Sequence, residues 1–302
     1  MIGRRELMGG KMFLNVEMSF TGTRNNCGAN ASGTTATYTV AAGTYTSKIS
    51  QIDADAQAQA DINANAQAYI NTNATCVLWT PTLVRPTVSP WTVPAGITNV
   101  DVFLVGGGGG GGTSGGGGGY TKTFLNVPVS PGQAIPFVIG AGGNPAPNTN
   151  TVVQAGYSEF LNSSYRAEGG YSGNPYNYNM GSYANSGNGG SGGGIDTYDF
   201  NGKSDGGSSQ DYSVGQGQGT TTRDFGDPSG ALNAGGGGGA PNGIGGDGQN
   251  SGYGFPAKSY GDEGAAGGGG GYGGGGGGSY GNPSYRGKGG DGTVLIRYYL
   301  PP

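Results

Sequence analysis

The run Gly-Gly-Gly-Gly-Gly-Gly-Gly-Thr-Ser-Gly-Gly-Gly-Gly-Gly occupies residues 106–119 and follows the strand-like segment 100–105. A glycine run has no side chains, so if it is ordered its backbone must serve as the packing surface. Polyproline II suits this role, because it has about three residues per turn and no internal hydrogen bonds. Its outward N–H and C=O groups then need neighbouring backbone or water as partners. The run predicts packed polyproline II helices, and the alternative is a flexible linker.

The rest of the chain favours the packed form over the linker. Further glycine runs occupy residues 235–239, 267–271 and 273–278, and strand patterns lie at 97–105, 120–129, 134–139 and 293–299. A tether has no reason to return to a sheet at its end. Ordering each residue costs roughly 1–2 kcal/mol, which a laterally hydrogen-bonded bundle can offset. We therefore expect structural roles for Gly106, Gly112, Gly235, Gly267 and Gly273.

Composition excludes several classes of partner. The chain has 302 residues, of which 72 are glycine, and its formal net charge is −4. Nucleic acids and anionic membrane surfaces need a basic footprint, so neither is expected as a partner. The sequence contains no apolar segment long enough for a transmembrane helix, and we expect no membrane insertion.

The first quarter of the chain has a different composition and predicts a separate module. Residues 1–16 are interpreted as an attachment arm, 17–78 as a small α+β module, 79–90 as a Pro-rich linker, and 91–302 as the glycine-rich domain. In the small module, residues 35–40 and 44–47 alternate as strands. Ser50 is a good N-cap for a helix over 51–73. Cys27 and Cys76 either form one bridge or remain buried thiols.

The small module resembles a short domain of unknown function that occurs in surface proteins of Bacteroidetes and their phages. The resemblance is carried by Cys27, residues 38–45, Ser47, Ser50-Gln51, residues 54–56, 61–65 and 67–69, and Cys76. It covers about a fifth of the chain and implies a surface or spacer role without catalytic residues.

The larger part is similar to a glycine-rich domain family that includes phage tail-fibre adhesins and the extracellular region of anaplastic-lymphoma-type receptor kinases. The similarity runs from Trp91-Thr92-Val93-Pro94-Ala95-Gly96 through the glycine run to residues 290–298. It implies a small β-sandwich carrying hexagonally packed polyproline II helices, with receptor contacts made by loops at the bundle tip. The expected fold class is mainly β and irregular: an α+β module with one long helix, then a β-sandwich with a glycine-rich polyproline II-type bundle.

Enzymatic chemistry finds little support in the residues. The run at 106 matches a G-x-G-x-x-G dinucleotide fingerprint, but the fingerprint needs a helix directly after the loop, and the glycines continue instead. The sequence contains no histidine, which removes the usual general base and His-based zinc sites. We expect no cofactor, no metal and no enzymatic activity. A depolymerase using two carboxylates is the remaining enzymatic alternative, with candidates Asp196, Asp199, Asp205, Asp211, Asp224 and Asp227.

The stretches between the glycine runs are the candidate binding loops. Their Tyr, Asn, Ser and Gly content parallels that of binding paratopes, where Tyr offers rigid contact area and Asn and Ser offer adaptable hydrogen bonds. The alternative is that these aromatics seal the sides of the bundle. The candidate receptor-binding residues are Tyr171, Tyr176, Asn177, Tyr178, Tyr183, Tyr198, Phe200, Tyr212, Phe225, Tyr253 and Phe255.

Together these features predict a phage spike or tail-fibre protein on the virion surface. It would bind a host surface glycan or outer-membrane protein, and it would contact other virion proteins through its N-terminal arm. A homotrimer is the expected state. The alternative is a subunit of a bacterial surface filament or sheath, located on the cell surface.

Overall fold

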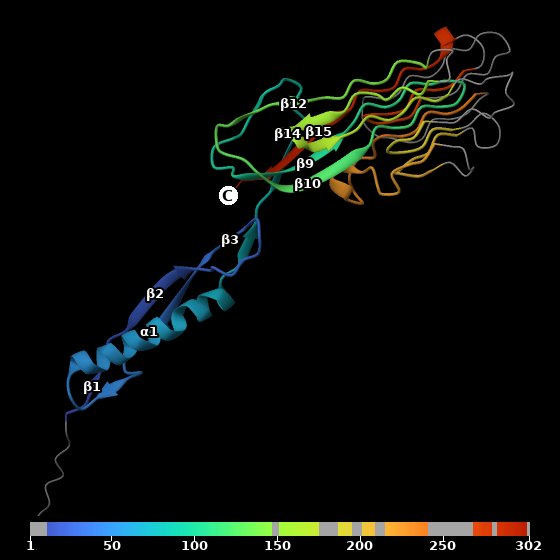
Figure 1. Ribbon diagram of the computed structural model, residues 1–302. Coiled ribbons are helices and arrows are strands. Elements are labelled where there is room, and N and C mark those ends of the chain that lie inside the picture. The colour runs from blue at the N-terminus through green and yellow to red at the C-terminus, as the bar shows by residue number, and fades with distance from the viewer. Residues whose placement is uncertain are drawn as a thin grey trace, which may run out of the picture. The chain divides into compact units, whose positions relative to one another are not determined.

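The computed structural model describes residues 11–146, 151–174, 187–194, 201–208, 215–240, 268–279 and 283–300. The chain divides into two compact units, Met1–Pro81 with Tyr299–Pro302, and Thr82–Tyr298. The fold is mainly β, and α1 (Gln51–Asn73) is the only α-helix in the described ranges (Figure 1). This confirms the expected fold class.

The small unit is built from three pairs of short antiparallel strands and α1. The pairs are β1 (Phe13–Leu14) with β5 (Thr46–Ser47), β2 (Met18–Thr23) with β4 (Thr35–Val40), and β3 (Ala31–Gly33) with β6 (Cys76–Leu78). The first strand of this unit, β1, lies inside the range 1–16 that was expected to be an attachment arm. The buried side chain of Asn15 explains this difference, because it accepts a hydrogen bond from the Tyr45 backbone and donates one to the Ala41 carbonyl.

The helix α1 covers the predicted residues, and Ser50 caps it by accepting a bond from the Asp53 backbone N–H. Every fourth residue of α1 is buried against the β2–β4 hairpin. These buried residues are Ala54, Ala58, Ile62, Ala66 and Ile70. A Cβ at Gly22 of β2 would lie 2.8 Å from Ile70 Cδ1, so the absent side chain makes room for the helix.

A disulfide joins Cys27 to Cys76 across a sequence separation of 49 residues. It ties the segment after β2 to the first residue of β6. Of the two alternatives that the sequence left open, the structure contains the bridge.

Asp61 on α1 binds two tyrosines from the hairpin region. Tyr38 Oη donates to Asp61 Oδ1 at 3.0 Å, and Tyr45 Oη donates to Asp61 Oδ2 at 2.9 Å. Hydrogen bonds from Asn65, Tyr45 and Tyr38 lower the pKa of the Asp61 carboxyl, against an opposing effect of desolvation. The same bonds raise the pKa of both phenols.

We expect the small unit to lose stability as the pH falls through the acid range. Because the pKa of Asp61 is lower in the folded state, its contribution is present above the ordinary value near 3.8 and is lost as the pH drops below it. Urea unfolding between about pH 6 and about pH 3 measures this. Asp61→Asn should flatten the profile, and Glu17→Gln, an exposed acid of the same unit, should not. An unchanged profile in Asp61→Asn would contradict the assignment.

Within the described residues of the larger unit there are two main sheets and one short strand pair. The first sheet has the order β10 (Thr121–Pro128), β9 (Asn99–Val105), β15 (Thr293–Tyr299), β7 (Pro81–Val84). The second has the order β12 (Phe137–Val138), β13 (Ser158–Phe160), β14 (Asn162–Ala167), and β11 (Ala134–Ile135) pairs with β8 (Trp91–Thr92). The edge strand β7 lies within the expected Pro-rich linker, which is therefore partly sheet. Proline cannot donate an N–H to a sheet, and an edge strand tolerates it because one side of that strand has no neighbouring strand to bond.

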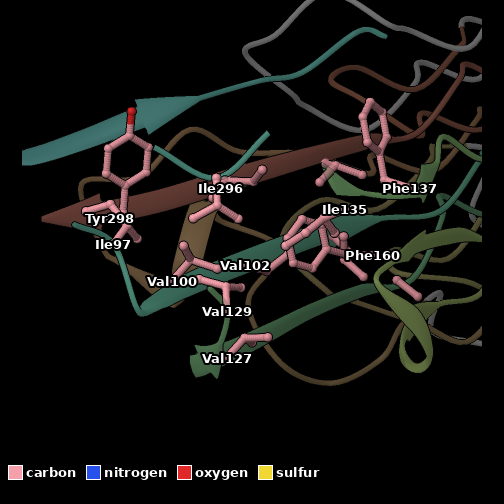
Figure 2. Packing of buried hydrophobic residues seen from close by; sticks show 14 residues of the cluster. Ile97, Val100, Val102, Val127, Val129, Ile135, Phe137, Phe160, Ile296 and Tyr298 are labelled. Carbon is pink, nitrogen blue, oxygen red and sulfur yellow. The ribbon is translucent and has the colours of Figure 1, made fainter. Parts of the chain in front are cut away.

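An apolar core fills the space between these sheets (Figure 2). Alternate residues of β9 point into it, and β15 contributes in the same way. The fully buried members include Val100, Val102, Phe160 and Ile296, with Ile135 from β11. Burying such side chains contributes about 1.5–3 kcal/mol each, so this core anchors the glycine segments that leave it.

The first glycine run continues directly from β9, and its contacts repeat every third residue. A Cβ on Gly106, Gly109 or Gly112 would strike carbonyls in the segment 168–173. A Cβ on Gly107 or Gly110 would strike carbonyls in the segment 141–144 in the same way. A Cβ on Gly108 or Gly111 would strike carbonyls in the segment 274–277. Three residues per turn is the repeat of polyproline II. Each of the three faces therefore lies against backbone, where only glycine fits.

The hydrogen bonds of the run join it to six neighbouring segments of the described chain. Its N–H groups donate to one set of carbonyls: those of residues 114, 117 and 120, of 156, and of 287 and 290. Its carbonyls accept from another set of N–H groups: those of residues 143 and 146, of 170 and 173, and of 276 and 279. Six neighbours around one helix is hexagonal packing. The second run, 115–119, returns beside the first and leads into β10.

The predicted structural glycines fall at different places in the bundle. Gly106, Gly112 and Gly235 all take part in lateral backbone bonds. Gly273 does as well, but its φ of +66° differs from the negative φ of polyproline II, so this residue marks a bend at the start of its segment. Gly267 lies outside the described residues.

Candidate functional site

Described residues that flank five stretches of the chain converge on one end of the bundle. At least one flanking residue of each stretch bonds to residues 111–115, where the first glycine run turns into the second, at the end away from β9 and β10. These flanking residues are Ala146, Asn174, Gly187, Gly194, Ala240 and Ser279. At least one attachment point of each of the five stretches therefore lies in the same small area, which we call the distal end.

Most candidate receptor-binding residues belong to those stretches and lie outside the described residues. These are Tyr176, Asn177, Tyr178, Tyr183, Tyr198, Phe200, Tyr212, Tyr253 and Phe255. Tyr176, Asn177, Tyr178 and Tyr183 fall between Asn174 and Gly187, which both bond at the distal end. Tyr198 and Phe200 follow Gly194, and Tyr253 and Phe255 follow Ala240, and each of these two flanking residues bonds there as well. The remaining two candidates, Tyr171 and Phe225, are described, and they lie at different sites.

Phe225 packs on the face of the β10–β9–β15–β7 sheet that lies opposite the main core. Its ring lies 5.9 Å from the Phe103 ring, and the Arg297 guanidinium stacks over it at 4.2 Å. Arg297 in turn donates to Asp101 at 2.8 Å. Phe225 joins a second apolar cluster with Val105 and Leu295. Its surroundings fit the sealing role that was the alternative for these aromatics.

We expect Phe225→Ala to lower the stability of the larger unit by about 1–3 kcal/mol, less than for a fully buried Phe. Cell adsorption by the folded protein should be unchanged. Thermal unfolding and a binding assay on host cells measure the two effects. Loss of adsorption at full stability would instead make Phe225 a binding residue.

Tyr171 lines a pocket of about 410 Å³ on the flank of the bundle, near the start of β10. The pocket residues are Tyr120, Thr121, Lys122, Gln154, Glu168, Tyr171, Gln218 and Thr220. Its size lies within the usual range for small-molecule sites, about 300–1,000 Å³. Among the candidates from the sequence, the structure places Tyr171 in a described cavity, and the other seven lining residues were not predicted.

The bundle holds the backbone of both pocket tyrosines. Tyr120 N–H donates to the Glu168 carbonyl at 3.0 Å, and the Tyr171 carbonyl accepts from Gly117 N–H at 2.9 Å. Gln154 and Tyr171 form an isolated antiparallel bridge. The aromatic rings thus project from a framework that the glycine helices determine.

Burial raises the pKa of Tyr120, and the nearby Tyr171 adds to this shift. The Tyr120 phenol is therefore neutral at physiological pH and keeps its O–H as a donor. Lys122 and Glu168 give the pocket one charge of each sign, so it has no strong preference for ions. The site suits a neutral, polar ligand with an apolar face.

The described acidic candidates for hydrolysis serve local structure. Asp224 pairs with Arg85 at 2.8 Å, and Asp227 accepts from Ser229. Desolvation tends to raise the pKa of Asp205, yet hydrogen bonds from Thr221 and Thr222 lower this pKa overall. Backbone and side-chain bonds from Ser229 also lower the pKa of Asp227. A general acid in glycoside hydrolysis needs a raised pKa. Asp196, Asp199 and Asp211 lie outside the described residues.

Neither a metal-binding cluster nor a membrane-spanning helix occurs within the described ranges. No cluster of three or more Cys, Asp or Glu side chains there is arranged to hold a metal ion. No helix in those ranges combines the length and apolar character needed to cross a bilayer.

Comparison with known families matches both parts of the chain. A family model described as a glycine-rich domain matches residues 84–299. A model described as a family of unknown function (DUF5977) matches residues 13–77. No curated protein and no solved structure matches the chain.

Proposed function

We propose that this chain, which belongs to the glycine-rich domain family, is a receptor-binding protein of a phage spike or tail fibre. It attaches the virion to a host surface molecule by non-covalent recognition and performs no catalysis. The observation that carries the proposal is the convergence of the flanking residues on residues 111–115 at the distal end.

This convergence has a physical consequence for binding. The glycine helices form a laterally bonded scaffold, so the points from which the Tyr/Asn-rich stretches leave are held at set spacings. Fixed attachment points reduce the ordering cost that a binding surface incurs when it engages its partner. Tyr and Asn are the residue types that such surfaces favour.

The small unit supports a location outside the cell. Its disulfide belongs to an oxidising environment, and its Cys27–Cys76 bridge holds the unit without a large core. We propose that this unit and the residues before it connect the glycine-rich unit to the virion. Several copies on one particle would add avidity to modest single-site affinity.

A blocking experiment tests the proposed function. Purified full-length protein is incubated with a panel of bacterial strains, and its ability to compete with phage adsorption is measured. We expect binding to susceptible strains and a loss of blocking in Tyr176→Ala/Tyr178→Ala. Tyr157→Ala, an exposed tyrosine of the same unit outside these stretches, is the matched control. Absence of binding to every susceptible strain would overturn the proposal.

A further inference from the structure

We infer that the flank pocket around Tyr120 and Tyr171 is a saccharide-binding site, separate from the stretches at the distal end. It lies at the start of β10, where the Tyr120 carbonyl accepts from Gly106 N–H and Thr121 begins the strand. That the sugar belongs to a host surface rests on the proposed function, whereas the chemistry of the pocket does not.

Gln218 lines the pocket, and its side-chain amide is bonded to the first residue of β10. Its Oε1 accepts from Thr121 N–H at 2.9 Å, and its Nε2 donates to Thr121 Oγ1 at 2.7 Å and to the Thr220 carbonyl at 3.1 Å. The amide oxygen and the amide nitrogen of Gln218 are thus both engaged, and they connect its side chain to β10. Gln218 therefore shapes the pocket and is not expected to contact a ligand.

Other groups around the pocket are available to a ligand. The rings of Tyr120 and Tyr171 have no aromatic or cationic partner among the residues that the structure describes, and their hydroxyls have no hydrogen-bond partner there. Gln154 Nε2 donates to the Gly169 carbonyl at 3.1 Å, and Gln154 Oε1 has no hydrogen bond within the described chain. Glu168 and Lys122 line the same pocket without an ion pair between them in the described ranges. The hydrogen bond to Glu159 raises the pKa of Arg166, and the charge of Glu168 adds to this shift.

This set of groups selects among ligand classes. A purely apolar ligand would leave the tyrosine hydroxyls without a hydrogen-bond partner, which is costly. A phosphate or polyanion would face Glu168, with Lys122 as the one cation among the described residues that line the pocket. A sugar ring has an apolar C–H face that can lie on a tyrosine ring, and its edge hydroxyls match the donors and acceptors here. The volume of about 410 Å³ accommodates one or two sugar units.

The inference is tested by titrating the full-length protein with neutral sugars. The probes are glucose, galactose, mannose, N-acetylglucosamine, N-acetylgalactosamine and their disaccharides, followed by saturation-transfer NMR and calorimetry. We expect at least one to bind at millimolar concentration, and Tyr171→Ala to weaken that binding at least tenfold. Tyr171→Phe should keep most of the affinity, because the stacking face remains.

Further variants separate the pocket from other effects. Thr220→Trp fills the cavity from an exposed position and should abolish sugar binding while the unfolding temperature stays near that of the natural chain. Tyr157→Ala, an exposed tyrosine outside the pocket, should bind as the natural chain does. No binding by any probe, binding unaltered in Tyr171→Ala and Thr220→Trp, or binding of unglycosylated peptides in place of sugars would overturn the inference.

The two proposals fail in different ways. Cell adsorption without sugar binding overturns the saccharide site and leaves the receptor-binding function in place. Sugar binding without cell adsorption keeps the saccharide site and overturns the proposed function.

Discussion

Replacing Gly111 by alanine is expected to disrupt the glycine-rich unit. A Cβ at this position would lie 1.9 Å from the Gly277 carbonyl oxygen. The clash is with backbone, so no side-chain rotation relieves it. The segment cannot move aside either, because Cβ atoms on Gly109 and Gly110 would each lie 2.0 Å from carbonyls of two other segments.

The expected loss of stability exceeds that of ordinary overpacking. Added methylene groups in a side-chain core usually cost about 1–3 kcal/mol, and we expect more than about 3 kcal/mol here. For a unit of this size, a loss of about 3 kcal/mol lowers the unfolding temperature by roughly 6–12 °C, and a larger loss lowers it further. Differential scanning calorimetry of the purified variant measures it, and failure to fold would appear as loss of the transition.

Gly207→Ala is the matched control in the same unit. A Cβ there would meet its nearest atom, the Ser204 carbonyl oxygen, at 3.1 Å, and its next neighbour is the side chain of Lys203 at 3.6 Å. We expect a change below about 1 kcal/mol. If Gly111→Ala melts within a few degrees of the natural chain, the glycine helices are not packed as the structure has them.

Removing the disulfide is expected to unfold the small unit selectively. The bridge spans 49 residues in sequence, and closing a loop of that length stabilises by about 4 kcal/mol in the chain-entropy description. The core beneath it is small, because several of the buried positions on α1 are alanine. Little other stabilisation remains once the bridge is lost.

The measurement is chemical unfolding of the Cys27→Ser/Cys76→Ser variant beside the natural chain with and without a reductant. The chain has 2 cysteines, so the larger unit serves as an internal control. Its transition should not move, while that of the small unit shifts to lower denaturant. Equal stability of the oxidised and reduced small unit would contradict the expected role of the bridge.

Local signals predicted some regular elements of the small unit, but no strand was expected at β1, β2, β3 or β6. The helix 51–73 and the strand 35–40 have the predicted bounds, because a cap at Ser50 and an alternating strand pattern act over a few residues. The sheet of the larger unit was predicted less completely. Strand β14 (Asn162–Ala167) was missed, since its mostly polar sequence lacks the alternation of apolar residues that marks a strand, although Arg166 pairs with Glu159 of β13 across the sheet.

The flank pocket could not be read from the sequence. Its lining residues come from positions as far apart as Tyr120 and Gln218, and the sequence places Tyr171 only among the candidate binding loops. One signal was available. Tyr120 and Tyr171 each directly follow a glycine segment, at the places where bulky side chains first reappear on the bundle surface.

The sequence by itself determined that residues 106–119 pack through their backbone, because a run without Cβ atoms has no other surface to bury. It also determined the three-residue repeat, which follows from the polyproline II geometry that unbranched glycine permits. Only the tertiary structure decided which segments surround the run and where the stretches between them leave the bundle. Identical glycines carry no side-chain code for register, so long-range backbone hydrogen bonds and the anchoring strands β9, β10 and β15 set the arrangement.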